Sequence, residues 1–151
     1  MPLELNLSLC LPTDERSVPV VRHICSFSLN EVGVSEVCQS DISIALTEAC
    51  TNVLDHATQD GEAYEVHISI DDERCIIRVK DGGIGFDVEA REEAREGEVE
   101  ITAESGRGLD LIRALVDRVK FISKPEEGVI VHLEKELEFD EDHPVRQALL
   151  S

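Results

Sequence analysis

The chain has 151 residues, of which 42% are apolar and only 3% aromatic, a composition typical of one folded domain with an aliphatic core. Its 33 acidic residues outnumber the 14 Lys and Arg residues and give a formal net charge of −19 at pH 7. Such a charge repels a phosphodiester backbone and an anionic membrane surface, so it disfavours direct binding to nucleic acid or to membranes. Most of the acid is expected to be solvated surface, and the alternative is steering of a partner that carries a basic patch.

Cysteine usage and the absence of a long apolar run indicate the compartment. The cysteines are odd in number, form no CxxC pair and lie in apolar or helical contexts, at positions Cys10, Cys25, Cys38, Cys50 and Cys75. They are expected to be buried small hydrophobes in a reducing cytosol. No window approaches the roughly 20 apolar residues that cross a bilayer, and the first residues lack a basic leader, so a cytoplasmic protein is predicted.

The first third of the chain predicts one strand and two helices. Residues 3–9 alternate apolar and polar side chains, as a half-buried strand does. A helix follows, with Ser17 as candidate cap, Pro19 in the first turn and Gly33 as its stop. The apolar face expected on that helix consists of Val20, Val21, Ile24 and Phe27. A second helix, 40–57, is predicted from the apolar positions Ile42, Ala45, Leu46, Ala49 and Val53.

The remainder predicts two hairpins around a long charged connection. Residues 64–70 and 74–80 alternate as one hairpin, and 119–123 with 129–134 form another. Between them, residues 87–105 have few apolar anchors and predict a lid, and a helix follows Gly108. Residues 1–135 are expected to form the domain, and the acidic tail, 136–151, to be loosely ordered. The element order predicts an α+β two-layer sandwich with a mixed, mostly antiparallel sheet and helices on one face.

Glu48 and Asn52 are the first candidate functional pair. Residues four apart lie on one helix face, so both side chains can point into one cleft. An Asn oxygen suits a hydrated Mg²⁺ that also takes phosphate oxygens, and a nearby Glu could accept a proton from an attacking hydroxyl or water. Taken alone, the same spacing is more often a plain surface pair.

Asp81, Gly83 and Gly85 form a second candidate group at the end of a strand. The Asp could accept a hydrogen bond from the amino group of an adenine, and glycines allow backbone to approach the ring. The alternative is an ordinary Asp-Gly-Gly turn. With Glu48 and Asn52, the group predicts an ATP site.

In a third motif, Gly106-Arg107-Gly108-Leu109, the first three residues precede the last predicted helix of the domain and Leu109 begins its apolar stripe. Amides at the start of that helix, together with Arg107, could bind phosphates, and the alternative is a hinge for the lid. The chain contains no Gly-x-x-x-x-Gly-Lys-Ser/Thr loop, so this is not a Walker-type site.

The three motifs, in this order, resemble the GHKL (Bergerat-fold) ATPases and, within them, the stand-alone anti-sigma-factor serine kinases of the RsbW and SpoIIAB type. The resemblance covers residues 3–134. It implies that Glu48 is the general base, Asn52 the magnesium ligand and Asp81 the adenine contact. It also implies that Gly83 and Gly85 line the base pocket, and that the phosphates are covered by Gly106, Arg107, Gly108 and Leu109.

The family also implies the partners. These would be a sigma factor, a serine-bearing anti-anti-sigma protein of the STAS type, and a second copy in a homodimer. Partner binding in the family uses an arginine-bearing face of the first helix, whereas this region offers Arg16 and Arg22, with Val20 near the position of the family's arginine. The alternative function is a nucleotide-gated binding module that transfers no phosphate. A histidine-kinase catalytic half fits poorly, because no helical hairpin with a phosphoacceptor His precedes the motifs.

Overall fold

The computed structural model describes residues 2–56, 63–81, 107–124 and 128–150. Five strands, four α-helices and one short 3-10 turn are defined in these residues. In chain order they are β1 (Glu4–Pro12), η1 (Glu15–Ser17), α1 (Val18–Glu31), α2 (Glu36–His56), β2 (Ala63–Asp71), β3 (Arg74–Asp81), α4 (Arg107–Leu115), β4 (Arg118–Lys124), β5 (Gly128–Glu136) and α5 (Pro144–Leu150).

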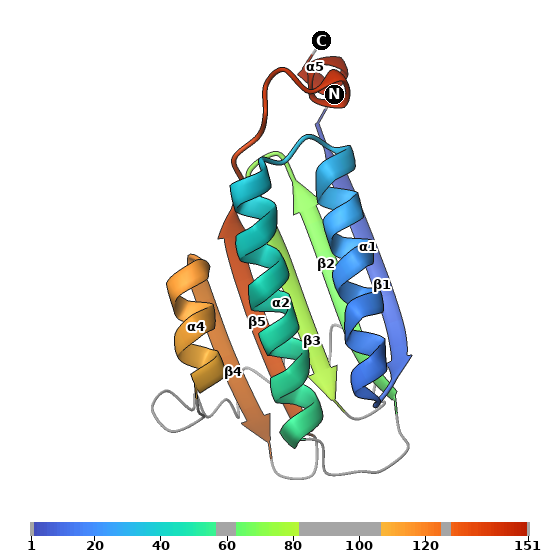
Figure 1. Ribbon diagram of the computed structural model, residues 1–151, viewed down its shortest axis with the longest axis vertical. Helices are drawn as coiled ribbons and strands as arrows, with labels where there is room; N and C mark the ends of the chain where they lie inside the picture. The colour runs from blue at the N-terminus through green and yellow to red at the C-terminus, as the bar shows by residue number, and fades with distance from the viewer. Residues whose placement is uncertain (1, 57–62, 82–106, 125–127, 151) are drawn as a thin grey trace.

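The strands form one sheet in the order β1-β2-β3-β5-β4, and all four pairings are antiparallel. Helices α1, α2 and α4 cover one face of this sheet (Figure 1). The two-layer α+β architecture expected from the sequence is therefore confirmed. None of the described helices is both long and apolar enough to cross a membrane.

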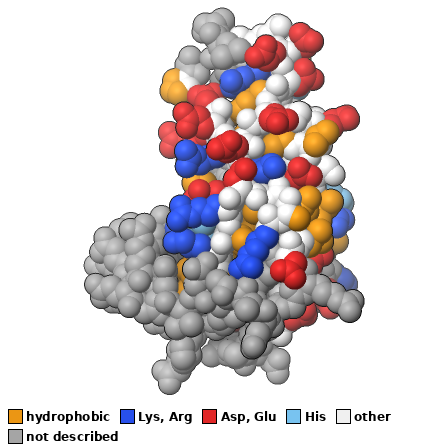
Figure 2. Space-filling view, turned by 90° about the vertical axis from the view of Figure 1, so that its left-hand side faces the viewer, with side chains coloured by type: hydrophobic (Ala, Val, Ile, Leu, Met, Phe, Trp, Pro, Cys, Tyr) orange, Lys and Arg blue, Asp and Glu red, His pale blue; other side chains and the backbone are white. Residues whose placement is uncertain are grey.

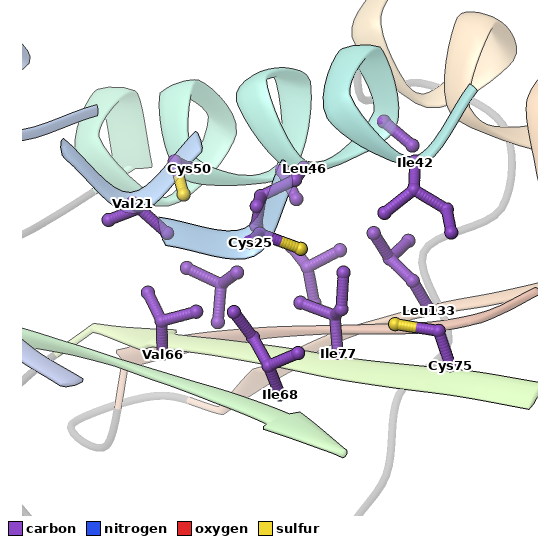
Figure 3. Packing of buried hydrophobic residues seen from close by; sticks show 14 of the residues in the cluster. Val21, Cys25, Ile42, Leu46, Cys50, Val66, Ile68, Cys75, Ile77 and Leu133 are labelled. Carbon is purple, nitrogen blue, oxygen red and sulfur yellow. The ribbon is translucent and has the colours of Figure 1, made fainter. Parts of the chain in front are cut away.

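The core lies between the helices and the sheet. Alternate residues of β2 and β3 are buried because successive side chains of a strand point to opposite faces. Val66, Ile68 and Ile77 from these strands pack beneath Val21 of α1 and Leu46 of α2 (Figure 3). The apolar positions predicted for α2 are all buried, and the helix begins at Glu36, four residues earlier than expected.

The predicted apolar face of α1 is correct at Val21 but wrong at Val20 and Phe27. Val20 is 47% exposed and Phe27 is 67% exposed. The residues that this helix buries are Val18, Val21, Cys25 and Leu29. These four follow spacings of three and four residues, so they form one stripe toward the sheet, and Val20 lies one position, or about 100°, away from it.

Gly33 ends α1, as predicted. Its backbone φ is +88°, in the left-handed region that favours glycine. The Gly33 amide donates to the carbonyl of Asn30 at 3.1 Å, and the Val34 amide donates to the carbonyl of Leu29 at 3.0 Å. This is the Schellman arrangement, with buried Leu29 and Val34 as its apolar contact.

The acidic tail is not loosely ordered, contrary to expectation. The Ser35 amide donates to the carbonyl of Glu138 at 2.8 Å, and the Asp140 amide donates to the carbonyl of Gly33 at 2.7 Å. Helix α5 then places Arg146 4.0 Å above the ring of Phe139 and 2.9 Å from the Asp72 carboxylate. The tail therefore packs on the turn between α1 and α2, at the end of the molecule where Figure 1 shows α5.

Smaller differences concern element ends and one cysteine. Strand β4 begins at Arg118 and ends at Lys124, one residue beyond the predicted strand at each end. Cys10 is exposed because it points outward from β1 at the sheet edge, whereas the other four cysteines are buried as predicted. The predicted lid, 87–105, lies outside the described residues.

Candidate functional site

Glu48 and Asn52 lie on the C-terminal half of α2, where the helix packs on β3 and β5. Buried Ala45 and Ala49 allow the helix to approach the sheet closely, while Glu48 is half-buried and Asn52 is 9% exposed. A polar side chain buried to this degree needs partners, so Asn52 is more than a plain surface residue.

The Asn52 carboxamide is oriented by the helix itself. Its Nδ2 donates a 2.9 Å hydrogen bond to the backbone carbonyl of Glu48. With the nitrogen engaged in this way, the carboxamide oxygen is the group directed away from the helix backbone. A neutral oxygen held one turn from a carboxylate is a donor set that fits a hydrated Mg²⁺.

Asp81 is the last residue of β3 and is 2% exposed. The alternation of the strand places its side chain on the same face as Val79, toward the helices, and therefore on the side of the sheet that carries Glu48 and Asn52. Figure 1 shows the ends of α2 and β3 and the start of α4 at the same end of the molecule. The fold thus brings Glu48, Asn52 and Asp81 to the same end of the molecule as the first turn of α4.

Tyr64, the cross-strand neighbour of Asp81, is tied by its hydroxyl to Ser17. Tyr64 lies directly opposite Asp81 in the pairing of β2 with β3, and its ring is fully buried. Its hydroxyl shares a 2.7 Å hydrogen bond with Ser17 Oγ at the start of α1. Burial raises the pKa of the Tyr64 phenol to about 12, so the phenol is neutral at physiological pH.

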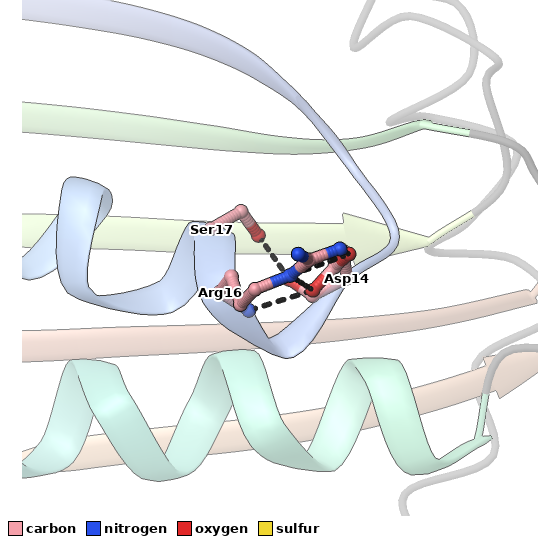
Figure 4. A network of polar contacts seen from close by, with 3 residues as sticks. All are labelled: Asp14, Arg16 and Ser17. Atoms are coloured by element: carbon pink, nitrogen blue, oxygen red, sulfur yellow. Dashed lines mark hydrogen bonds and ion pairs between the residues drawn. The ribbon is translucent and has the colours of Figure 1, made fainter.

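The entry to α1 is fixed by a small polar network (Figure 4). Asp14 accepts a 2.9 Å bond from the Arg16 amide and pairs with the Arg16 guanidinium at 2.6 Å. Hydrogen bonds from Arg16 lower the pKa of the Asp14 carboxyl to about 2. Ser17 Oγ donates to the Asp14 carbonyl at 2.6 Å, so Ser17 occupies the cap position of α1 without the expected side-chain capping bond.

Sequence reasoning did not assign Ser17 or Tyr64 to the surroundings of the site. Tyr64 is the single tyrosine of the chain, and it begins a strand whose hairpin partner ends at Asp81. Counting the hairpin register from the turn at residues 72–73 would have placed Tyr64 opposite Asp81. The contact with Ser17 joins residues 47 apart in the chain, and no local pattern predicts it.

The third motif differs from its expected position. Arg107 and Gly108 lie inside the first turn of α4 rather than before it, and Leu109 lies in the helix as predicted. The first backbone amides of a helix have no partner within it, so these residues supply amides suited to an anion. Gly83, Gly85 and Gly106 lie outside the described residues, and their predicted roles stay predictions.

Comparison with known proteins agrees with this geometry. The family described as the histidine kinase-like ATPase domain matches residues 11–135. A solved structure of the RsbU and RsbW domains of a Mycobacterium tuberculosis protein has a TM-score of 0.65 at 20% identity, covering 88% of this chain and 32% of that longer chain. The structural likeness shows the shared fold.

Curated relatives are more specific. A serine-protein kinase RsbW of Halalkalibacterium halodurans is 34% identical over 141 residues, which cover 90% of this chain and 86% of the relative. An RsbW of Listeria innocua is 37% identical over 139 residues, covering 86% of each chain. The chain belongs to the histidine kinase-like ATPase family and, within it, to the RsbW serine-protein kinases. It is accordingly an ATP-binding protein serine kinase.

Proposed function

We propose that this kinase transfers the γ-phosphoryl group of ATP to a serine of an anti-anti-sigma protein of the STAS type, and that it also binds and inhibits a sigma factor. The observation that carries the proposal is the placement of half-buried Glu48 and buried Asn52 one turn apart on α2, at the end of the molecule where β3 ends at Asp81. Phosphoryl transfer needs positioning and charge stabilisation more than covalent help, and these residues offer a base and an oxygen ligand.

Glu48 is the base in this proposal. The serine oxygen attacks the γ-phosphorus, the bond to the β-phosphate oxygen breaks, ADP leaves, and the Glu48 carboxylate takes the serine proton. Asn52 would hold Mg²⁺ through its carboxamide oxygen. Bound there, Mg²⁺ neutralises charge on the phosphates.

The remaining roles follow the position of each motif. Asp81 accepts a hydrogen bond from the adenine amino group, with Gly83 and Gly85 lining the base pocket. The phosphates are covered by Gly106, Arg107, Gly108 and Leu109. Support for the last assignment is that α4 begins at Arg107, which puts its first amides at the same end of the molecule as α2 and β3.

The partners and assembly are also proposals. We place the kinase domain at residues 1–135, with a lid at 87–105 and a C-terminal segment at 136–151, and we infer a cytoplasmic homodimer. Exposed Val20 and Phe27 on α1 support a partner surface on that helix that is more apolar than an arginine-bearing one. Arg16 is engaged by Asp14 in the preceding turn.

Phosphate transfer is tested with a Glu48→Gln variant. Radiolabel from ATP to a purified serine-bearing STAS protein is expected to fall roughly 10²- to 10⁴-fold, because general-base catalysis contributes about that much. ATP affinity should stay within a few-fold of wild type, since Gln keeps the size of the side chain. The matched control is Glu31→Gln, an exposed residue at the far end of α1, which should transfer like wild type.

Two results would decide against the proposal. If Glu48→Gln transfers phosphate as well as wild type, Glu48 is not the base and the proposed kinase mechanism is wrong. If wild type binds ATP but labels no serine-bearing partner, the nucleotide-gated binding module is the better description. Sigma-factor binding is tested separately by co-purification and mass spectrometry, and recovery of neither a sigma factor nor a small STAS protein would indicate another adaptor role.

A further inference from the structure

The face of the sheet opposite the helices carries a row of cationic and neutral polar side chains. In the strand register, Ser8 lies opposite His67, His67 opposite Arg78, Arg78 opposite His132, and His132 opposite Lys120. This row crosses all five strands and contains no acidic residue, although the whole chain has a net charge of −19. On the same face, Glu65 lies 3.9 Å from His67 and Glu134 lies 2.9 Å from His132. Outward-pointing basic residues here stand out against the acidic background.

Basic side chains also gather at the β4 end of this row. Arg118 and Lys120 alternate on β4 and share a face, because residues two apart on a strand point the same way. Figure 2, which views the β4 and α4 side of the molecule, shows Lys and Arg side chains grouped midway along it. An anion approaching this part of the sheet meets positive charge.

Arg78 is held in place by its neighbours on β5. Its Nε donates a 2.9 Å hydrogen bond to His132 Nδ1, and His132 Nε2 lies 2.9 Å from Glu134 Oε1. Since Nδ1 accepts, the hydrogen of the neutral ring is on Nε2, which donates to Glu134. Burial lowers the pKa of His132 and favours this neutral ring. The Arg78 guanidinium is therefore oriented by His132, which is itself held by Glu134.

A hollow of about 420 Å³ lies beside this arginine on the outer sheet face. The polar side chains that line it are Asn6, Ser8, His67, Ser69, Arg78, His132 and Glu134. The Glu134 carboxylate is the acidic group among them, and it is engaged by its bond to His132. Ser8 Oγ and His67 Nδ1 are 3.0 Å apart, so these two side chains are also fixed relative to each other. The volume is in the range of small-ligand sites, about 300–1,000 Å³.

We propose that this hollow is a binding site for a small oxyanion, with Arg78 as its anchor and the hydroxyl and amide groups of Ser8, Ser69 and Asn6 as further donors. The planar fork of a guanidinium matches a phosphate or a carboxylate, and Arg78 lines the hollow with its Nε bonded to His132. The site lies on the opposite face of the sheet from Glu48, Asn52 and Asp81. It is therefore separate from the nucleotide site and independent of the proposed function.

The test is calorimetric titration of the full chain with inorganic phosphate and, separately, with citrate, at constant ionic strength and with a saturating non-hydrolysable ATP analogue. The analogue fills the nucleotide site, including the γ-phosphate position, so heat from phosphate binding there is removed. We expect saturable binding of at least one anion, and the one that binds identifies the phosphate or the carboxylate class. Arg78→Gln should weaken it about tenfold or more, because charge-assisted bonds to an oxyanion are lost.

Two variants make the result specific. Arg78→Lys keeps the charge but loses the fork, and it should bind between wild type and Arg78→Gln. Arg22→Gln removes a positive charge from α1, on the other side of the molecule, and should bind like wild type. Circular dichroism of each variant establishes that it is folded before it is titrated, and Arg78→Lys carries the test if Arg78→Gln does not fold.

Three results would overturn the proposal. The first is no saturable binding of either anion, and the second is an equal loss of affinity in Arg22→Gln. The third comes from sedimentation under the same conditions. If Arg78→Gln changes the oligomeric state while anion affinity is unaltered, this face is an interface between copies of the chain instead of an anion site.

Discussion

The side-chain nitrogen of Asn52 donates a 2.9 Å hydrogen bond to the backbone carbonyl of Glu48, one helix turn earlier. This bond orients the Asn52 oxygen and ties the proposed magnesium ligand to the residue that carries the proposed base. Asn52→Ala removes the oxygen, so magnesium-dependent phosphate transfer should fall on the order of 10²-fold, the usual cost of one such electrostatic group. A kinase assay over a series of Mg²⁺ concentrations measures it.

The matched control for Asn52 is Thr51→Ala. Thr51 is exposed on the same turn of α2, and its hydroxyl donates to the carbonyl of Thr47 at 2.8 Å. The substitution therefore changes the same helix without touching the buried face, and transfer should be unaffected. Equal loss in both variants would indicate damage to the helix rather than loss of a ligand.

Much of the sheet and of the site could be predicted from local pattern. Strand β2 buries Val66, Ile68 and Ile70 at every second position, because one face of the sheet packs on helices and the other faces outward. Glu48 and Asn52 could be paired from helical spacing alone, since i and i+4 residues always share a face.

Features that depend on distant contacts could not be predicted in this way. Val20 and Phe27 are as apolar as Val21, so hydrophobicity alone did not indicate which stripe of α1 meets the sheet. The acidic composition of the tail predicted a loosely ordered segment, but Arg146 stacks on the ring of Phe139 and pairs with the carboxylate of Asp72. The ion pair between Arg146 and Asp72 joins residues 74 apart in the chain, so it cannot be predicted from composition.

Gly33 is the residue that the packing of the tail most restricts. A Cβ added there would lie 3.0 Å from Arg146 Cβ and 3.1 Å from His143 Cβ, and the backbone φ of +88° disfavours any side chain. Gly33→Ala should lower the free energy of unfolding by about 2 kcal/mol, from backbone strain and crowding together. Urea unfolding monitored by circular dichroism measures the change.

Gly33→Asn separates the two causes. Asn tolerates the left-handed region better than Ala but brings the same Cβ. If backbone strain dominates, Gly33→Asn should be clearly more stable than Gly33→Ala. If crowding against α5 dominates, the two variants should be equally destabilised, and a wild-type stability for both would contradict the geometry of this turn.

Arg146 connects the C-terminal helix to the rest of the fold. Its guanidinium stacks on Phe139 and pairs with Asp72, whose other carboxylate oxygen accepts a 3.0 Å bond from the Leu3 amide. Arg146→Ala should therefore raise amide hydrogen exchange in residues 143–150, with little change in β2 and β3. Arg146→Lys keeps the charge but loses the planar stack, so its amide exchange in residues 143–150 should lie between that of wild type and that of Arg146→Ala.

An unchanged exchange pattern in Arg146→Ala would mean that the backbone bonds of Ser35 and Asp140 hold the tail without the side chain. The kinase activity of the variant supplies a second readout. Since α5 lies at the far end of the molecule from Glu48 and Asn52, transfer should remain at the wild-type level (Figure 1).

Because of His132, the free energy of unfolding should depend on pH even at pH values higher than those at which carboxylates titrate. Burial lowers its pKa below the ordinary value of 6.5, so the unfolded chain takes up a proton first as the pH falls. The free energy of unfolding should therefore decline from about pH 6.5 downward, until the folded His132 is also protonated. The pKa of Glu134 is lowered from 4.5, so the stability that this carboxylate contributes is lost only at a pH below 4.5.

The variant His132→Gln tests this assignment. Its side chain can still accept from Arg78 and donate to Glu134, but it does not titrate. Urea unfolding at about pH 7.5, 6.5 and 5.5 should therefore show a shallower decline in the free energy of unfolding for the variant. The same slope in both proteins would assign the pH dependence to the other histidines.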